Sequence, residues 1–256
     1  MTTLYYSRPD IKEQRKDRYT AEFGSVLLDT CSGDVSFEER ILLRLNRFAG
    51  MTCSEIEEQL KKQLDSNPKQ YYNILVKEML GLPRTKYIEE FEIAGIAIKT
   101  VRIKSDWTPK ESMSFNTFDP RELVKEGEWK ESALFRQLDR EFLIPVFQFE
   151  DRPEKVKRKE LRFKGSFFWK LTDEDLDIVC GVWEDTKKKI EEKRSDFVKI
   201  SDDRIAHIRP HDVRKRIDLE GNDITKKSFW LNAKYWEAII KDELDESHKK
   251  FEQSHL

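Results

Sequence analysis

The sequence has few cysteines and no long apolar run. Its 3 cysteines are Cys31, Cys53 and Cys180, and none forms a CxxC pair or stands near a histidine at metal-ligand spacing. We therefore expect neither a disulfide framework nor a zinc site, and we expect a reducing, cytoplasmic location. No apolar stretch approaches the roughly 18 residues of a membrane span. The first residues are polar and charged, unlike a secretory signal, so no membrane partner is expected.

The chain also lacks an excess of charge of one sign. Its 48 Lys and Arg residues and 50 Asp and Glu residues leave a net charge of −2, so no global basic field indicates nucleic acid. The signs are nevertheless segregated, with 8 basic and 2 acidic residues from Arg152 to Lys170, and 5 basic residues against Asp212 from Arg204 to Arg216. Such runs are commonly solvated faces. Their segregation also suits a protein that follows a phosphate backbone.

Helical periodicity predicts helices between Ser36 and Gly81. Thr52 and Glu55 have capping-box spacing, and apolar residues follow them at helical intervals. The pair Asn67-Pro68 interrupts the pattern, which then resumes until Gly81 ends it.

Branched and apolar residues predict strands further along the chain. The segment from Phe91 to Ile103 has a β pattern. Phe142 to Phe149 is a nearly continuous apolar run, typical of a strand buried on both faces, in which Pro145 must lie where no ladder N–H is needed. Ile205 to Arg209, ended by a proline, and Phe229 to Leu231 are shorter strands.

Two more helices complete the expected fold. Thr172 caps an acid-rich helix, Tyr235 to Leu244 forms the last one, and Gly221-Asn222 is a turn. The result is a mixed α/β fold with a central mixed sheet flanked by helices. Residues 1–35 are the least constrained, and residues 36–256 form one domain, or two lobes of it around a cleft.

The segment Gly95 to Thr100 contains Ala-x-Lys where many nucleases have acid-x-Lys. Residues two apart on a strand face the same way, so a carboxylate and an ammonium would project together to hold Mg²⁺ and orient a water. Lys99 is in place, but Ala97 cannot ligate a metal. Glu92 could substitute only if a bulge at Gly95 changed the parity of the strand. Alone, the motif is compatible with an ordinary strand that carries a surface lysine.

The motif lies in one of six segments that occur in a recognisable order. They are Lys69 to Gly81, Glu90-Phe91 through Lys99-Thr100, Trp129 to Val146, Gly165-Ser166 to Trp169 with the acidic helix after it, Ile208-Arg209-Pro210, and Phe229-Trp230-Leu231. In order and spacing they resemble the MutH mismatch-repair endonuclease and its relatives, the GATC-cutting restriction endonucleases of the Sau type. The resemblance implies a restriction-endonuclease-like fold with a DNA-binding cleft.

The departures from this family fall on the residues that the resemblance assigns to catalysis. Glu90 stands for the first metal-binding Asp, and Ala97 for the second acid. Lys77 stands where a helical Glu assists catalysis, and Gln137 where the family has a further basic residue. Lys99 alone is kept. The resemblance therefore implies a pseudo-nuclease that has no catalytic residues, metal or cofactor, whereas its active relatives use Mg²⁺.

The DNA-reading side of the family is better kept. The resemblance gives Arg209 the place of a base-reading Arg, and arginine bound to guanine by two hydrogen bonds is the commonest specific major-groove contact. His211 replaces a Lys, Trp230 falls at an aromatic position, and Phe115 corresponds to an aromatic wedge, although core packing is an alternative for both rings. The candidate DNA-binding residues, including basic residues for phosphates, are Arg209, Pro210, His211, Trp230, Phe115, Lys157, Arg158 and Arg214.

Three functions remain open at this point. The favoured one is a catalytically inactive domain that binds double-stranded DNA at GATC and acts as an allosteric effector on the catalytic domain of the same type II restriction enzyme. The second is an active Mg²⁺-dependent GATC endonuclease with a relocated carboxylate. The third is a protein-interaction domain. Ala97 and Lys77 separate the first two, and the basic segments with Arg209 argue against the third.

Overall fold

The computed structural model describes residues 36–82, 89–202, 204–210, 217 and 224–253, without the side chains of residues 89, 90, 93 and 248–253. The predicted turn at Gly221-Asn222 lies outside these residues. The chain divides into two compact units. Unit 1 comprises the described residues up to Thr108, Glu141–Trp169 and the chain from Ile239, and unit 2 comprises Pro109–Arg140 and Lys170–Ala238. No described helix is long and apolar enough to cross a membrane.

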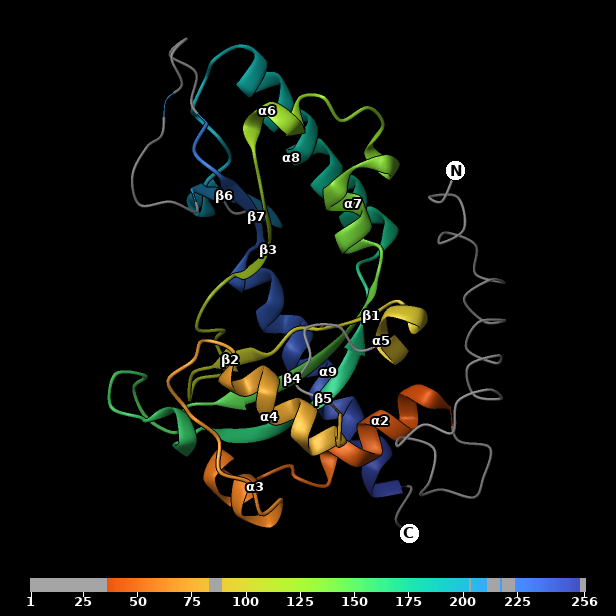
Figure 1. Ribbon diagram of the computed structural model, residues 1–256, viewed down its shortest axis with the longest axis vertical. Coiled ribbons are helices and arrows are strands. Elements are labelled where there is room, and N and C mark those ends of the chain that lie inside the picture. The colour runs from red at the N-terminus through yellow and green to blue at the C-terminus, as the bar shows by residue number, and fades with distance from the viewer. Residues whose placement is uncertain (1–35, 83–88, 203, 211–216, 218–223, 254–256) are drawn as a thin grey trace. The chain divides into compact units, whose positions relative to one another are not determined.

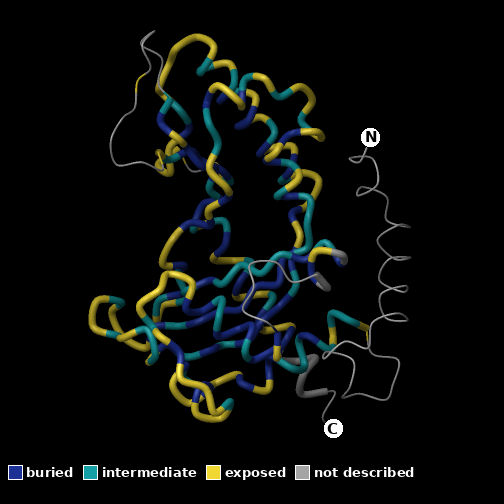
Figure 2. Tube along the Cα trace, in the orientation of Figure 1, coloured by how far each residue is buried: buried dark blue, intermediate teal, exposed yellow. Residues whose placement is uncertain are grey.

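The sheet of unit 1 is built around β4 (Glu141–Gln148). Along one edge of β4, β1 (Ile96–Ile98) and β2 (Val101–Ile103) pair with it in parallel, and β5 (Arg162–Trp169) pairs antiparallel along the other (Figure 1). The six inner residues of β4 are buried, as expected for a strand covered on both faces (Figure 2). The predicted central strand and the mixed sheet are therefore confirmed.

Pro145 lies opposite an interruption in this sheet. The N–H groups of Glu141 and Phe149 donate to the edge formed by the chain around β1 and β2. Because the direction of N–H groups alternates along a strand, the nitrogen of Pro145 points to the same edge, where it has no hydrogen to donate. At that level β1 has ended and β2 has not begun, and the residues between them are Lys99 and Thr100. The proline is tolerated at this gap because no ladder N–H is needed there, and β1 ends where the gap begins.

The predicted strand from Phe91 to Ile103 is wrong over its first part. A short helix, α5 (Glu89–Ala94), occupies it, and Gly95 follows with φ 70°, a left-handed conformation that suits the end of a helix. The branched residues suggested a strand, but Phe91 is buried in the core from a helical position. Glu92 therefore lies exposed on a helix, and the bulge expected at Gly95 is a helix end instead.

Within the described residues, three further helices lie before α5 in the chain: α2 (Phe37–Asn46), α3 (Cys53–Gln59) and α4 (Tyr71–Leu80). The predicted capping box of Thr52 and Glu55 is present at the start of α3. Gly81 ends α4 with φ 72°, also as predicted. These helices share one hydrophobic core with one face of the sheet, and Phe147 of β4 lies in it between the rings of Tyr72 and Phe163, 4.9 and 5.3 Å away.

Unit 2 contains a second sheet, which the sequence did not predict as separate. Its order is β3 (Met113–Phe118), β7 (Lys227–Leu231) and β6 (Ala206–Pro210), all antiparallel (Figure 1). The predicted strands correspond to β6 and β7, and β3 was missed. The long helix α8 (Asp173–Glu191) is capped by Thr172 as predicted and contacts β6. The remaining elements are α6 (Pro120–Leu123), α7 (Ala133–Leu138), α9 (Ala233–Gln253) and short 3₁₀ turns at Trp129–Glu131, Arg158–Glu160 and Ile200–Asp202.

Removal of the ring at the centre of β4 should destabilise the protein strongly. Phe147 is fully buried, so Phe147→Ala should lower the free energy of unfolding by about 3–5 kcal/mol through lost burial and the cavity left behind. Urea unfolding followed by intrinsic fluorescence measures the change. Ile178→Ala serves as the control, because Ile178 is 47% exposed and its loss should change the value by about 0.5 kcal/mol or less. A loss below about 1 kcal/mol for Phe147→Ala would contradict its place in the core.

Candidate nucleic-acid interface and degenerate metal centre

Ala97 and Lys99 lie two residues apart at the end of β1. Ala97 pairs with Phe142 of β4, and the N–H of Lys99 donates to the carbonyl of Leu143 at 3.0 Å just after the strand has ended. Both residues are half-buried. Burial lowers the pKa of Lys99 to about 8, because the ammonium form loses more by desolvation than the neutral amine. A methyl group thus stands beside this lysine where the resemblance implies a carboxylate.

Lys77 and Glu90 lie on the helices before this strand. Lys77 is on α4 and 7% exposed, and burial lowers its pKa. Glu90 is on α5, and its side chain is outside the described residues. Mg²⁺ binds oxygen ligands, and no cluster of three or more His, Cys, Asp or Glu side chains that could hold a metal occurs among the described ones. The side chains described at Lys77 and Lys99 are amines and supply no oxygen ligand.

Gln137 belongs to unit 2, where it makes local hydrogen bonds. It lies on α7, its Oε1 accepts from the N–H of Asn116 at 2.8 Å, and its Nε2 donates to the carbonyl of Ala133 at 3.0 Å. These contacts tie α7 to β3.

Arg209 and Trp230 form a stacked pair on the sheet of unit 2. In the register of β6 and β7, His207 lies opposite Trp230, and Arg209 lies opposite Ser228. The guanidinium carbon of Arg209 is 5.0 Å from the centre of the Trp230 ring, within the range of a cation–π contact. Both side chains are half-buried, and Pro210, which ends the strand, is exposed. The pair holds a planar five-donor group next to an aromatic face.

His207 is the buried neighbour of this pair. It is 1% exposed, and within the described part of the chain neither of its ring nitrogens nor Nε1 of Trp230 has a hydrogen-bond partner. Burial, and secondarily the charge of Arg209, lower the pKa of His207 to about 4. The imidazole is therefore neutral at neutral pH and adds no second positive charge beside Arg209.

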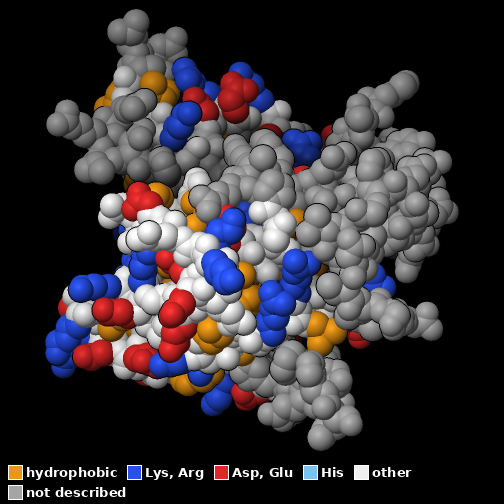
Figure 3. All heavy atoms as spheres, turned by 60° about the horizontal axis from the view of Figure 1, so that its bottom comes forward, with side chains coloured by type: hydrophobic (Ala, Val, Ile, Leu, Met, Phe, Trp, Pro, Cys, Tyr) orange, Lys and Arg blue, Asp and Glu red, His pale blue; other side chains and the backbone are white. Residues whose placement is uncertain are grey.

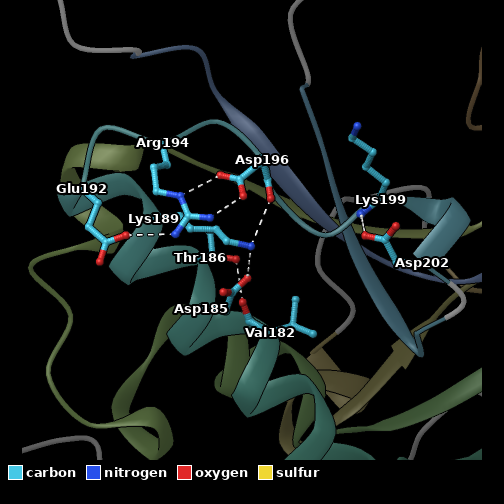
Figure 4. Close-up of polar contacts among 9 residues, drawn as sticks. All are labelled: Val182, Asp185, Thr186, Lys189, Glu192, Arg194, Asp196, Lys199 and Asp202. Carbon is cyan, nitrogen blue, oxygen red and sulfur yellow. Dashed lines mark hydrogen bonds and ion pairs between the residues drawn. The ribbon is translucent and has the colours of Figure 1, made fainter.

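A network of ion pairs orders the segment that leads from α8 to β6 (Figure 4). Lys189 binds Asp185 at 2.7 Å and the carbonyl of Asp196 at 3.0 Å. Arg194 binds the carboxylate of Asp196 through two nitrogens and Glu192 through a third, at 3.1 Å. Two residues further on, the carbonyl of residue 198 accepts from the backbone of β6. These contacts hold the connection between α8 and β6, the strand that carries Arg209.

Three of the other predicted DNA-binding residues are less informative. Phe115 lies on β3 and is 6% exposed, which agrees better with the core-packing alternative than with an aromatic wedge. His211 and Arg214 are outside the described residues.

The basic segment after β4 is largely engaged within unit 1. Nη1 of Arg158 donates to the carbonyls of residues 66, 67 and 68 at 2.7–2.8 Å, closing the turn before α4. Lys159 binds the buried carboxylate of Glu57 at 2.7 Å, and Arg162 pairs with Glu150. Basic and acidic side chains also alternate on the face of unit 1 shown in Figure 3. Lys157 is exposed, so the structure leaves it, more than Arg158, accessible to a phosphate.

Comparison with known proteins agrees with the family resemblance. Residues 82–180 match the family described as DNA mismatch repair enzyme MutH. Over this stretch the chain is similar to that family. The type II restriction enzyme Sau3AI of Staphylococcus aureus is 32% identical over 197 residues, which cover 60% of this chain and 40% of that enzyme. The chain thus spans less than half the length of this curated relative.

The matched residues include four of the five positions that the resemblance assigns to catalysis. Glu90, Ala97, Lys99 and Gln137 fall within residues 82–180, whereas Lys77 lies before them and Arg209 and Trp230 lie beyond them. Sequence reasoning placed Ala97 on the right strand, whereas Lys99 follows the end of that strand. It missed the hydrogen bonds from Arg158 to the carbonyls of residues 66, 67 and 68, because backbone acceptors leave no signal in a sequence.

Lys99 should titrate near pH 8. Reductive ¹³C-methylation of the protein and NMR should reveal one resonance with that midpoint, missing from Lys99→Arg, with exposed Lys130 measured in the same sample as the comparison. Because the folded pKa is lowered, the unfolded chain binds more protons between about pH 8 and 10.5, so this group favours folding increasingly as pH rises through that window. A midpoint for Lys99 equal to that of Lys130 would contradict its desolvation.

Proposed function

We propose that this chain is a catalytically inactive MutH-like domain that binds double-stranded DNA at GATC sites and needs no metal to do so. The observation that carries the proposal is Ala97, which stands two residues before Lys99 on β1 in place of a metal-binding carboxylate. The buried ammonium of Lys77 supports it, because a positive charge replaces a carboxylate that would favour a cation. The frame of the fold is kept while its acidic centre is lost.

The pair of Arg209 and Trp230 supports sequence reading. A guanidinium held flat against an indole ring loses less freedom when it binds, and it can offer two parallel hydrogen bonds to the edge of a guanine. Neutral His207 leaves Arg209 as the charged member of this group. Phosphate contacts from exposed residues such as Lys157 would add affinity without sequence preference.

The proposed role in the whole protein is that of an allosteric effector. A relative of which this chain spans 40% is a type II restriction enzyme, so its length allows a second, catalytic domain beside a domain of this kind. An effector can bias such a neighbour only if it binds DNA with different affinity in the two states of the whole enzyme. The partners of this chain are then DNA and the catalytic domain of the same enzyme.

One observation favours a second candidate, an active Mg²⁺-dependent endonuclease. Helix α5 carries Glu90 and Glu92 directly before β1, and Glu92 is exposed. A carboxylate from this helix could replace the missing one.

The first expected outcome is that the protein does not cleave DNA. A GATC-rich plasmid incubated with excess protein and Mg²⁺ or Mn²⁺ should stay supercoiled, because Ala97 supplies no ligand and Lys77 repels the ion. A GATC-cutting restriction enzyme on the same plasmid is the positive control. Specific nicking that Glu92→Ala abolishes and Glu58→Ala preserves, both side chains being exposed, would establish the endonuclease instead.

The second expected outcome separates base reading from phosphate binding. Arg209→Ala should weaken binding to a GATC duplex by roughly fivefold to 150-fold, equivalent to about 1–3 kcal/mol, and leave a scrambled duplex nearly unchanged. Arg209→Lys should lose the same preference, because an ammonium cannot make the paired contact. Lys157→Ala should weaken both duplexes alike and reduce the salt slope by about one unit.

Gel shifts over a salt series measure these differences. Equal affinity of the wild type for both duplexes would remove the claim of sequence reading. Failure to bind either duplex at about 50 mM salt would remove the claim of DNA binding.

A further inference from the structure

The turn after β2 places a tryptophan in the left-handed region of the backbone. Trp107 has φ 70°, where an L-residue brings its Cβ close to the following carbonyl, and a bulky side chain is rare there. Lys61 and Lys193 also have positive φ, but they follow the ends of α3 and α8, where this conformation is common. Trp107 does not follow the end of a helix, so the helix-end explanation does not apply to its left-handed backbone.

Hydrogen bonds hold this turn in place. The N–H of Lys104 donates to the carbonyl of Thr108 at 2.8 Å, and the N–H of Trp107 donates back to the carbonyl of Lys104 at 3.0 Å. The carboxylate of Asp106 accepts from the N–H and the hydroxyl of Thr108, at 3.0 and 2.6 Å, and these bonds lower its pKa. Gln148, at the end of β4, donates to the carbonyl of Lys104 at 3.2 Å. The strained conformation persists because its surroundings over-determine it.

The indole ring is only half-buried, so burial does not account for it. The ammonium of Lys164, on the neighbouring strand β5, lies 5.4 Å from the centre of the Trp107 ring. Lys104 begins the same turn. Glycine would adopt this backbone without strain, yet the chain has a tryptophan here, with the ammonium of Lys164 beside its ring.

We propose that Trp107, with Lys104 and Lys164, is a sequence-independent DNA contact of unit 1. The flat indole packs against a deoxyribose of the duplex backbone, and the two ammonium groups meet the neighbouring phosphates. Every nucleotide carries the same sugar and phosphate, so such a contact tolerates any sequence. Tryptophan also suits protein interfaces, but the flanking lysines favour a polyanion. This inference rests on the proposed DNA-binding function.

Trp107→Gly is the decisive variant, because glycine relieves the backbone strain and keeps the turn. We expect its affinity for GATC and scrambled duplexes, measured by fluorescence anisotropy, to fall alike by roughly fivefold to 150-fold. Its stability in urea should stay within the error of the wild type or increase. Trp107→Phe should keep most of the affinity, and Lys164→Ala should lower the salt slope for both duplexes by about one unit.

Two results would overturn the inference while the proposed function stands. One is wild-type DNA binding that Trp107→Gly leaves unchanged. The other is a loss of affinity that follows a loss of stability across Trp107→Gly, Trp107→Asn and Trp107→Phe, which would assign the ring to the fold. If the wild type binds neither duplex, the proposed function fails, and the DNA contact at Trp107 fails with it.

Discussion

The burial of β4 on both faces is the constraint on which unit 1 depends. Its apolar residues pair with β5 along one edge, and along the other edge the proline at position 145 removes a donor and coincides with the gap between β1 and β2. The gap begins after Ile98, and Lys99 follows with its N–H still bonded to the carbonyl of Leu143. The positions of Ala97 and Lys99 are therefore set by their pairing with the buried strand β4.

The side chains at this strand differ from those that the family resemblance implies for a metal site. Mg²⁺ is bound by carboxylate and other oxygen ligands. The described side chains here, Ala97, Lys77 and Lys99, offer no such ligand. In unit 2, Arg209 is stacked on Trp230. These features are the basis of the proposed function, in which DNA is bound and read without being cut.

The sequence predicted the parts of the fold that rest on strong local signals. The apolar run of β4 and the cap at Thr52 are such signals, and both were found. Helix α5 was missed because it directly precedes the branched residues of β1 and β2, and the sequence does not show that Gly95 adopts a left-handed backbone. Strand β3 was missed although buried and exposed residues alternate from Met113 to Asn116, because asparagine is uncommon in strands. The strained turn at Trp107 could not be predicted, since the hydrogen bonds that hold it come largely from the backbone.

The central claim is that DNA is bound without a divalent metal. Its most direct test is the affinity of the wild-type protein for a GATC duplex, measured by anisotropy first in EDTA and then in Mg²⁺ at constant ionic strength. The account predicts equal affinity in both, apart from weak competition of Mg²⁺ for phosphates. An affinity that rises about tenfold or more when Mg²⁺ is added, equivalent to about 1.4 kcal/mol, would show that a metal completes the site and would contradict the account.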